Sequence, residues 1–200
     1  MRIYMIRHGE TELNQRGCYY GKTDAALTEK GRRQAEELGR YFREMTWDRI
    51  VVSPLKRAWD TAILATGRDP ENFEAEERLG EQSFGIFEGL TYPEICQRYP
   101  KEMEAWNRDF SDYRIPEGES FSDVRRRVEA WVKSLPTDKG NMLVVAHKGT
   151  LGHMLAAMLD MPLQGYWNFV FDQGCYSCVD LEDGYAIIRR LNQTVSLAER

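Results

Sequence analysis

The segment RIYMIRHGET, residues 2–11, places an arginine and a histidine directly after a run of apolar and aromatic residues. The run Ile3–Ile6 is typical of a short buried strand, so Arg7 and His8 would stand just past its end. In open α/β sheets, ligands bind beyond the carboxyl ends of the strands. We therefore expect Arg7 and His8 to face a ligand site.

Two later segments repeat this arrangement. Residues 50–58 read IVVSPLKRA and residues 142–149 read MLVVAHKG, so Arg57 and His147 would also follow buried strands. Guanidinium groups hold phosphate oxygens bidentately, and an imidazole with a free ring nitrogen can attack phosphorus. Two arginines and two histidines at one sheet edge therefore predict a phosphate site that contains a nitrogen nucleophile. A carboxylic acid is then needed to protonate the leaving alkoxide.

Strand and helix patterns alternate along the chain. This alternation predicts an α/β fold, a three-layer αβα sandwich with a mainly parallel central sheet. The less regular region at about 80–120 predicts a small helical cap, and residues 1–200 are expected to form one domain. A polar loop is expected at 7–27. We expect strands at 2–6, 49–52, 73–75, 141–146, 176–181 and 185–191, and helices at 29–45, 55–66, 101–112 and 150–159, with further helices after Thr91 and Ser120.

Composition narrows the class of protein. Hydrophobic residues make up 42% and charged residues 30% of the 200 residues, and 27 Lys and Arg against 32 Asp and Glu give a net charge of −5. This balance argues against nucleic-acid binding, and no apolar stretch reaches the roughly 20 residues of a membrane span. With no signal-peptide pattern, we expect a cytoplasmic protein that binds a small phosphorylated metabolite. The sequence does not decide the oligomeric state, and a homodimer is one of the possibilities.

The pair Cys175-x-x-Cys178 suggests a zinc or redox site. Zinc would need two further ligands at matching spacing, and the chain has no second such pair. The pair also lies in a segment that is typical of a strand. We therefore favour packing in the core or at a sheet edge, and we expect no metal.

The motifs together resemble the histidine phosphatase superfamily, the phosphoglycerate-mutase-like proteins, over nearly the whole chain. The resemblance rests on RHGET with Asn14, Gly21-x-x-Asp24, Ser53-Pro54-x-x-Arg57-Ala58, Leu79-x-Glu81 with Gly85 and Glu88-Gly89, and Ala146-His147. It implies that His8 is the phosphorylated nucleophile. It also implies that Arg7, Arg57 and His147 hold the phosphoryl oxygens, with Asn14 as a further hydrogen-bond partner.

The same resemblance implies that Glu81 is the general acid and afterwards the general base. Glu10 and Glu88 compete for this role, but the first is expected to be structural and the second lies in a Glu-Gly turn. No cofactor is implied. Further substrate-binding residues are expected to be Tyr20, Gly21 and Lys148.

One departure from the superfamily pattern points to a branch. Most members have glycine directly after the second histidine, but here Lys148 stands between His147 and Gly149. This form, together with DQGCYS at 172–177, is similar to the α-ribazole phosphatase branch. The branch implies a metal-independent phosphomonoesterase of cobalamin biosynthesis that hydrolyses α-ribazole 5′-phosphate through a phosphohistidine. Trp167-x-Phe169 also fits the branch, although a shared core would explain these two residues equally well.

Other functions stay open at this stage. A mutase of this superfamily has arginine directly after the catalytic glutamate, where this chain has Gln82, and a longer lid insertion that is missing here. The motifs are also compatible with a broad-specificity phosphatase, a sugar-phosphate or phosphoserine phosphatase, or a non-catalytic phospho-ligand binder. Several aromatic residues could line a leaving-group pocket or belong to a core: Tyr19, Tyr20, Tyr92, Trp106, Phe110 and Tyr113.

Overall fold

Six strands form a mixed, mostly parallel sheet in the computed structural model, which describes residues 1–136 and 139–195. In the sheet order β4-β3-β6-β1-β7-β8, the first four strands run parallel, and the pairs β1–β7 and β7–β8 are antiparallel. The predicted α/β fold with a mainly parallel sheet is therefore confirmed. The strands are β1 (Arg2–Arg7), β3 (Arg49–Val52), β4 (Glu74–Ala75), β6 (Asn141–Ala146), β7 (Cys175–Glu182) and β8 (Tyr185–Thr194).

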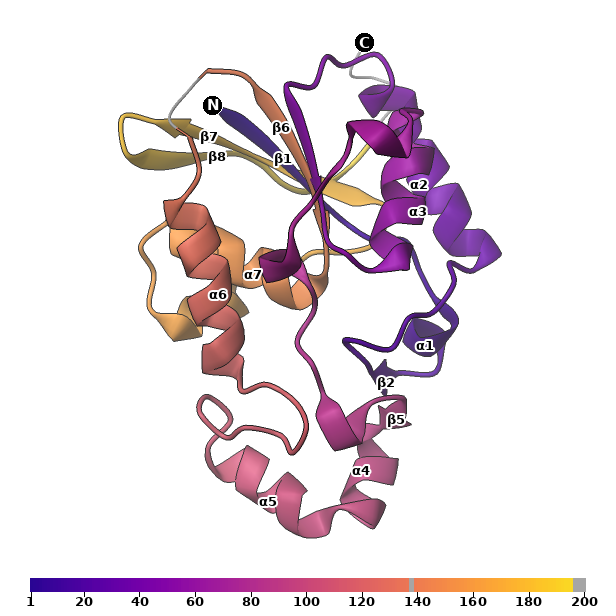
Figure 1. The fold of residues 1–200 in the computed structure, drawn as a ribbon, viewed down its shortest axis with the longest axis vertical. Helices are drawn as coiled ribbons and strands as arrows, with labels where there is room; N and C mark the ends of the chain where they lie inside the picture. Colours follow the sequence, from indigo (N-terminus) through magenta and orange to yellow (C-terminus); the bar gives the residue numbers. More distant parts are fainter. Residues whose placement is uncertain (137–138, 196–200) are drawn as a thin grey trace.

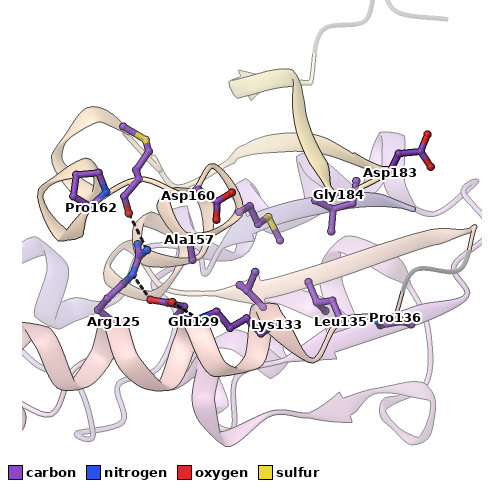
Figure 2. A pocket seen from close by; sticks show the side chains of 14 residues that line it. Arg125, Glu129, Lys133, Leu135, Pro136, Ala157, Asp160, Pro162, Asp183 and Gly184 are labelled. Atoms are coloured by element: carbon purple, nitrogen blue, oxygen red, sulfur yellow. Dashed lines mark hydrogen bonds and ion pairs between the residues drawn. The ribbon is translucent and has the colours of Figure 1, made fainter.

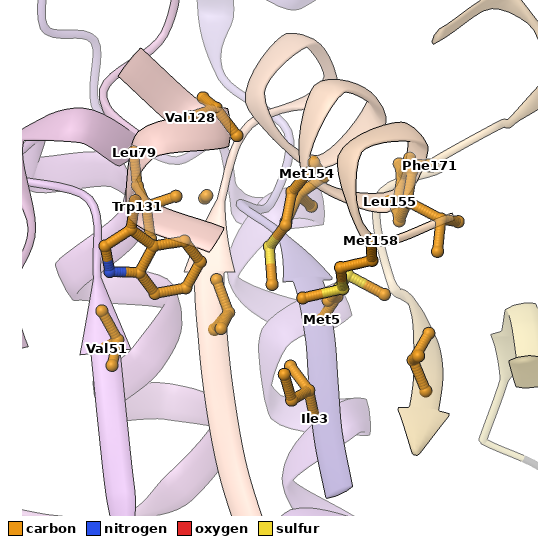
Figure 3. Close-up of a cluster of buried hydrophobic side chains, with 14 of the residues drawn as sticks. Ile3, Met5, Val51, Leu79, Val128, Trp131, Met154, Leu155, Met158 and Phe171 are labelled. Atoms are coloured by element: carbon orange, nitrogen blue, oxygen red, sulfur yellow. The ribbon is translucent and has the colours of Figure 1, made fainter. Parts of the chain in front are cut away.

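Helices cover both faces of the sheet (Figure 1). The helices α2 (Glu29–Phe42) and α3 (Lys56–Thr66) pack on one face, and α6 (Phe121–Lys133) and α7 (Lys148–Met158) pack on the other. Because successive strand residues point to opposite faces, β1 contributes side chains to the hydrophobic clusters on both faces of the sheet. Ile3 and Met5 belong to the hydrophobic cluster with α6 and α7, which Figure 3 shows. Ile6 belongs to the cluster on the opposite face, with α2 and α3. Full burial of each such side chain contributes about 1.5–3 kcal/mol, so the strands that carry the site are anchored on both sides.

A cap projects from one end of the molecule (Figure 1). It contains β5 (Leu90–Thr91), α4 (Tyr92–Arg98), α5 (Pro100–Arg108) and the 3-10 turn η3 (Gly85–Phe87), and α4 begins with a Thr91–Glu94 capping box. The cap has its own hydrophobic cluster, which includes Phe87, Ile95 and Trp106. A cap at about 80–120 is as predicted, but it also recruits β2 (Cys18–Tyr19), which pairs with β5.

Some element boundaries differ from the sequence prediction. The expected loop at 7–27 contains β2 and the short helix α1 (Glu12–Gln15), where the Thr11 side chain accepts a hydrogen bond from the Asn14 amide. One helical turn is too short to show a periodic pattern. The last long helix, α7, begins at Lys148 and not at Thr150, so His147 is its N-cap. Four 3-10 turns had no counterpart in the prediction: η3 in the cap, η1 (Pro70–Asn72), η2 (Glu77–Leu79) and η4 (Leu163–Asn168).

The cysteine pair is not part of a metal cluster. Cys178 packs in the core with Tyr4 on the α2–α3 side of the sheet, and Cys175 is partly exposed. Within the described residues, no three His, Cys, Asp or Glu side chains lie together so as to hold a metal ion. None of the helices in that part of the chain is long and apolar enough to cross a membrane.

Candidate active site

The carboxyl ends of three parallel strands bring the predicted residues together. His8 follows β1, His147 follows β6, and Arg57 lies in the first turn of α3, which follows β3. The ring centroids of His8 and His147 are 5.1 Å apart. The convergence expected from three distant segments is present in the structure.

The position of His8 favours one tautomer. Its Nδ1 lies 2.8 Å from the carbonyl oxygen of Gly9. A carbonyl can only accept, so Nδ1 carries the hydrogen and Nε2 keeps the lone pair. Burial, together with the positive charges of Arg57 and Arg7, holds the pKa of His8 well below its usual value. The ring is therefore neutral, and it presents a nitrogen that can act as a nucleophile.

His147 is fully buried beside it. Its Nε2 lies 2.6 Å from the Ser53 hydroxyl, and its buried Nδ1 has no hydrogen-bond partner within the part of the chain that the structure describes. Burial lowers the pKa of His147 well below its usual value, and His8 and Arg57 add to this effect. Ser53 belongs to the SPLKRA segment, but no pattern in that segment assigned it a role.

Arg57 is held by main-chain carbonyls. Its Nη1 donates to Thr23 O at 3.0 Å and its Nη2 donates to Gly21 O at 2.8 Å, while the guanidinium carbon lies 4.7 Å from the centroid of the Tyr20 ring. A carboxylate of Asp24, itself 43% exposed, is 3.6 Å away. Carbonyl dipoles orient the guanidinium without cancelling its charge, so Arg57 keeps charge available for an anion.

Arg7 is held in a similar way. Its Nη1 donates to Phe171 O at 3.1 Å. The Nε atoms of both Arg7 and Arg57 are buried and have no hydrogen-bond partner among the described residues. Buried guanidinium nitrogens with unused donors are costly unless an anion completes the site. A phosphate group has the charge and the oxygens to do so.

Glu81 lies at the same pocket. Its Oε1 accepts from the Gln82 amide at 3.0 Å, and its Oε2 accepts from the Gly149 amide at 3.1 Å. A Cβ atom at position 149 would overlap the Glu81 carboxylate. This overlap explains why the glycine stands one residue after Lys148: the small residue makes room for Glu81.

The two competing glutamates are engaged elsewhere. Glu10 pairs with Lys30 at 2.9 Å and accepts from Thr28. Glu88 accepts amide hydrogens of the 21–23 loop and of Phe84. Neither residue lines the pocket, so the geometry favours Glu81 as the acid.

The remaining predicted residues are placed as follows. The pocket has a volume of about 350 Å³, and its lining includes Asn14, Tyr20 and Lys148. Gly21 does not line it and acts only through its carbonyl on Arg57. The glycine of the RHGET segment, Gly9, lies against the backbone of Gly31 in α2, where a Cβ atom would overlap the Gly31 carbonyl.

The aromatic candidates divide between pocket and surroundings. Tyr19, Trp106 and Phe110 line the pocket, whereas Tyr92, which is 46% exposed, and Tyr113 do not. Regular spacing within helices could not separate these two groups.

Sequence reasoning missed several residues of the site. Arg127 donates to the carbonyl of Glu81 at 3.2 Å and pairs with Glu119, which fixes the backbone of Glu81. His153 and Tyr166 line the pocket, as does Trp167, which the core interpretation would have buried but which is 62% exposed. No local motif marked His153 or Tyr166, and the Trp167-x-Phe169 pattern did not assign Trp167 to the pocket.

A larger cavity, of about 830 Å³, lies between α6, α7 and the β7–β8 turn (Figure 2). Its described lining contains Arg125, Glu129 and Asp160 but no histidine. The phosphate chemistry therefore belongs to the smaller pocket.

Comparison with known proteins agrees with this geometry. Residues 3–194 match the model of the histidine phosphatase superfamily, branch 1. The chain belongs to this superfamily. It is a phosphatase, and the predicted family is confirmed.

Individual relatives refine the comparison. The chain is 37% identical to an adenosylcobalamin/α-ribazole phosphatase of Salmonella typhimurium, over 96% of each chain. It is 30% identical to phosphoserine phosphatase 1 of Hydrogenobacter thermophilus, over all of this chain and 95% of the relative. The solved structure of the α-ribazole phosphatase from Shigella flexneri superposes with a TM-score of 0.90 at 32% identity, covering 98% of this chain and 99% of the other.

Proposed function

We propose that this phosphatase is a metal-independent phosphomonoesterase that hydrolyses α-ribazole 5′-phosphate in cobalamin biosynthesis. The observation that carries the chemistry is the neutral His8, whose Nε2 lone pair is free beside the fully buried Arg57 and the partly buried Arg7. The substrate is supported by the similarity to α-ribazole phosphatases over nearly the whole chain.

The residues divide the reaction into two steps. In the first, Nε2 of His8 attacks phosphorus and the bond to the leaving oxygen breaks, while protonated Glu81 donates its proton to that oxygen. In the second, the Glu81 carboxylate takes a proton from water, which attacks phosphorus and releases phosphate and free His8. Arg7 and Arg57 neutralise the charge on the phosphoryl oxygens in both steps, and the uncharged ring of His147 helps to orient them.

Further contacts belong to the same proposal. Asn14, Tyr20 and Lys148 bind the substrate from the lining of the pocket, and Gly21 contributes by holding Arg57. We also propose that residues 1–200 act as one domain, because the pocket is lined by both the sheet edge and the cap. A cytoplasmic location is part of the same proposal.

The test is phosphate release in the presence of EDTA. The substrates are α-ribazole 5′-phosphate, phosphoserine, ribose 5-phosphate, 3-phosphoglycerate and p-nitrophenyl phosphate. We expect the highest kcat/KM for α-ribazole 5′-phosphate. A higher value for phosphoserine would overturn the substrate while keeping the His8 chemistry, and no release from any of them would overturn the activity.

A further inference from the structure

Five aromatic rings that line the active-site pocket contact one another. They come from four segments that are separate in the sequence, and they carry no role in the phosphate chemistry. We name them the aromatic wall: Phe110, Phe121, His153, Tyr166 and Trp167. Phe121 is the central ring, with centroids of His153 at 4.3 Å and Tyr166 at 4.8 Å.

Trp167 is the exposed member of this wall. Its indole is 62% exposed, whereas Phe121 is 5% and His153 1% exposed. It is nevertheless held in place, since it stacks on Phe121 at 5.8 Å with an interplanar angle of 12° and contacts Phe110 at 5.4 Å and Tyr166 at 4.9 Å. A large apolar surface that is both fixed and open to the pocket is suited to binding.

The wall carries no charge at neutral pH. Burial lowers the pKa of His153 to about 3, with Arg125 and Arg127 adding to the effect, so its imidazole is neutral. Burial raises the pKa of Tyr166, which keeps its phenol protonated. The pocket therefore combines a cationic phosphate end with an uncharged aromatic surface.

Arg125 fixes the two main-chain segments behind the wall. Its Nη1 donates to the carbonyl of His153 in α7 at 3.5 Å, and its Nη2 donates to the carbonyl of Met161, shortly before η4, at 2.9 Å. Its Nε is paired with Glu129 at 3.0 Å (Figure 2). The segment that carries Trp167 is thus tied to the helix that follows the catalytic His147.

We propose that Trp167 determines leaving-group specificity by stacking on a flat, uncharged aromatic group of the phosphorylated alcohol, such as the base of a nucleoside 5′-phosphate. This inference rests on the proposed phosphatase function and assigns the recognition to one residue. A pocket of about 350 Å³ is within the range of small-molecule sites. A leaving group that carries a carboxylate or an ammonium group would gain no charge pairing from this wall.

The test compares Trp167→Ala with wild type on α-ribazole 5′-phosphate and on ribose 5-phosphate, which has the same phosphorylated sugar without a base. Loss of base–aromatic stacking should lower kcat/KM for α-ribazole 5′-phosphate about tenfold, mainly through KM, and leave ribose 5-phosphate unchanged. Trp167→Phe should restore part of the loss. The matched control is Tyr185→Ala, which removes an aromatic side chain that is 74% exposed and lies on β8, outside the pocket lining, and should change neither substrate.

Equal losses on both substrates, or no loss on either, would overturn the role of Trp167. Failure of the proposed substrate is a separate result, in which wild type hydrolyses ribose 5-phosphate but not α-ribazole 5′-phosphate. In that case, inhibition of ribose 5-phosphate hydrolysis by free α-ribazole decides about Trp167. An inhibition constant about tenfold higher in Trp167→Ala supports the proposal, and an unchanged constant refutes it.

Discussion

Gly149→Ala should disable the acid without removing any catalytic group. The added Cβ would stand 3.1 Å from Cδ of Glu81 and closer still to Oε1. The backbone on both sides is fixed, because Gly149 lies in the first turn of α7 and Arg127 holds the carbonyl of Glu81. The carboxylate must therefore retreat by about 1 Å, and a displacement of this size can cost about 10²-fold in rate, or about 2.7 kcal/mol.

The assay for this variant is kcat/KM on two substrates with different leaving groups. An alkoxide such as that of ribose 5-phosphate needs the proton from Glu81, whereas p-nitrophenolate departs readily without it. We expect a loss of about 10²-fold for ribose 5-phosphate and less than about tenfold for p-nitrophenyl phosphate. Glu81→Gln should reproduce this pattern.

The reasoning is refuted if Gly149→Ala slows both substrates equally or slows neither. A change in fold is recognised separately from the thermal unfolding midpoint. Alanine is about 1 kcal/mol more favourable than glycine within helices, so the substitution by itself does not weaken α7.

Four further outcomes are expected. His8→Ala should abolish phosphate release and leave no acid-labile phosphoenzyme after quenching; a labelled phosphoenzyme in this variant would contradict the assignment of the nucleophile. Ser53→Ala leaves Nε2 of His147 unsatisfied in a buried site and should lower the free energy of unfolding in urea by about 1–3 kcal/mol, whereas an unchanged value would mean that the hydroxyl is dispensable. Dialysis against EDTA should leave turnover unchanged, and a loss that added Mg²⁺ or Zn²⁺ reverses would disprove the metal-free mechanism. The depressed pKa of His153, about 3 in the fold, means that only the unfolded chain takes up this proton as pH falls below about 6.5; its contribution to stability is full above that pH and declines by about 2 kcal/mol by pH 5. His153→Phe should flatten the stability profile in that range, and a profile parallel to wild type would show that another group is responsible.

The phosphate end of the pocket could be predicted because its residues follow strands. Buried strands give short apolar runs, and the carboxyl ends of parallel strands meet at one sheet edge. Arg7, His8 and His147 could therefore be grouped without any contact information. The match between Glu81 and Gly149 could not be found in this way, because it joins two segments 68 positions apart through a single close approach.

Apart from Phe110, which was a candidate for the leaving-group pocket, the aromatic wall was not predictable, for a different physical reason. Tyr166 and Trp167 lie in a 3-10 turn, which has no periodic hydrophobic pattern. His153 lies in α7, which is apolar on nearly all sides because it is almost entirely buried, so one polar residue does not mark a face. In the cap, helical spacing indicates burial but does not say whether the buried side faces a core, as Ile95 does, or a pocket, as Trp106 does in part.

The hydrogen bond from Nδ1 of His8 to the carbonyl of Gly9 has an evolutionary consequence. The acceptor is a main-chain atom, so no single side-chain replacement can delete it, and the His8 ring keeps its orientation while the surrounding sequence changes. The second histidine lacks this protection, because its ring is oriented by the hydroxyl of Ser53 and one codon change removes that group. Among diverging descendants of this chain, loss of function should therefore arise more readily through the partner of His147 than through the partner of His8.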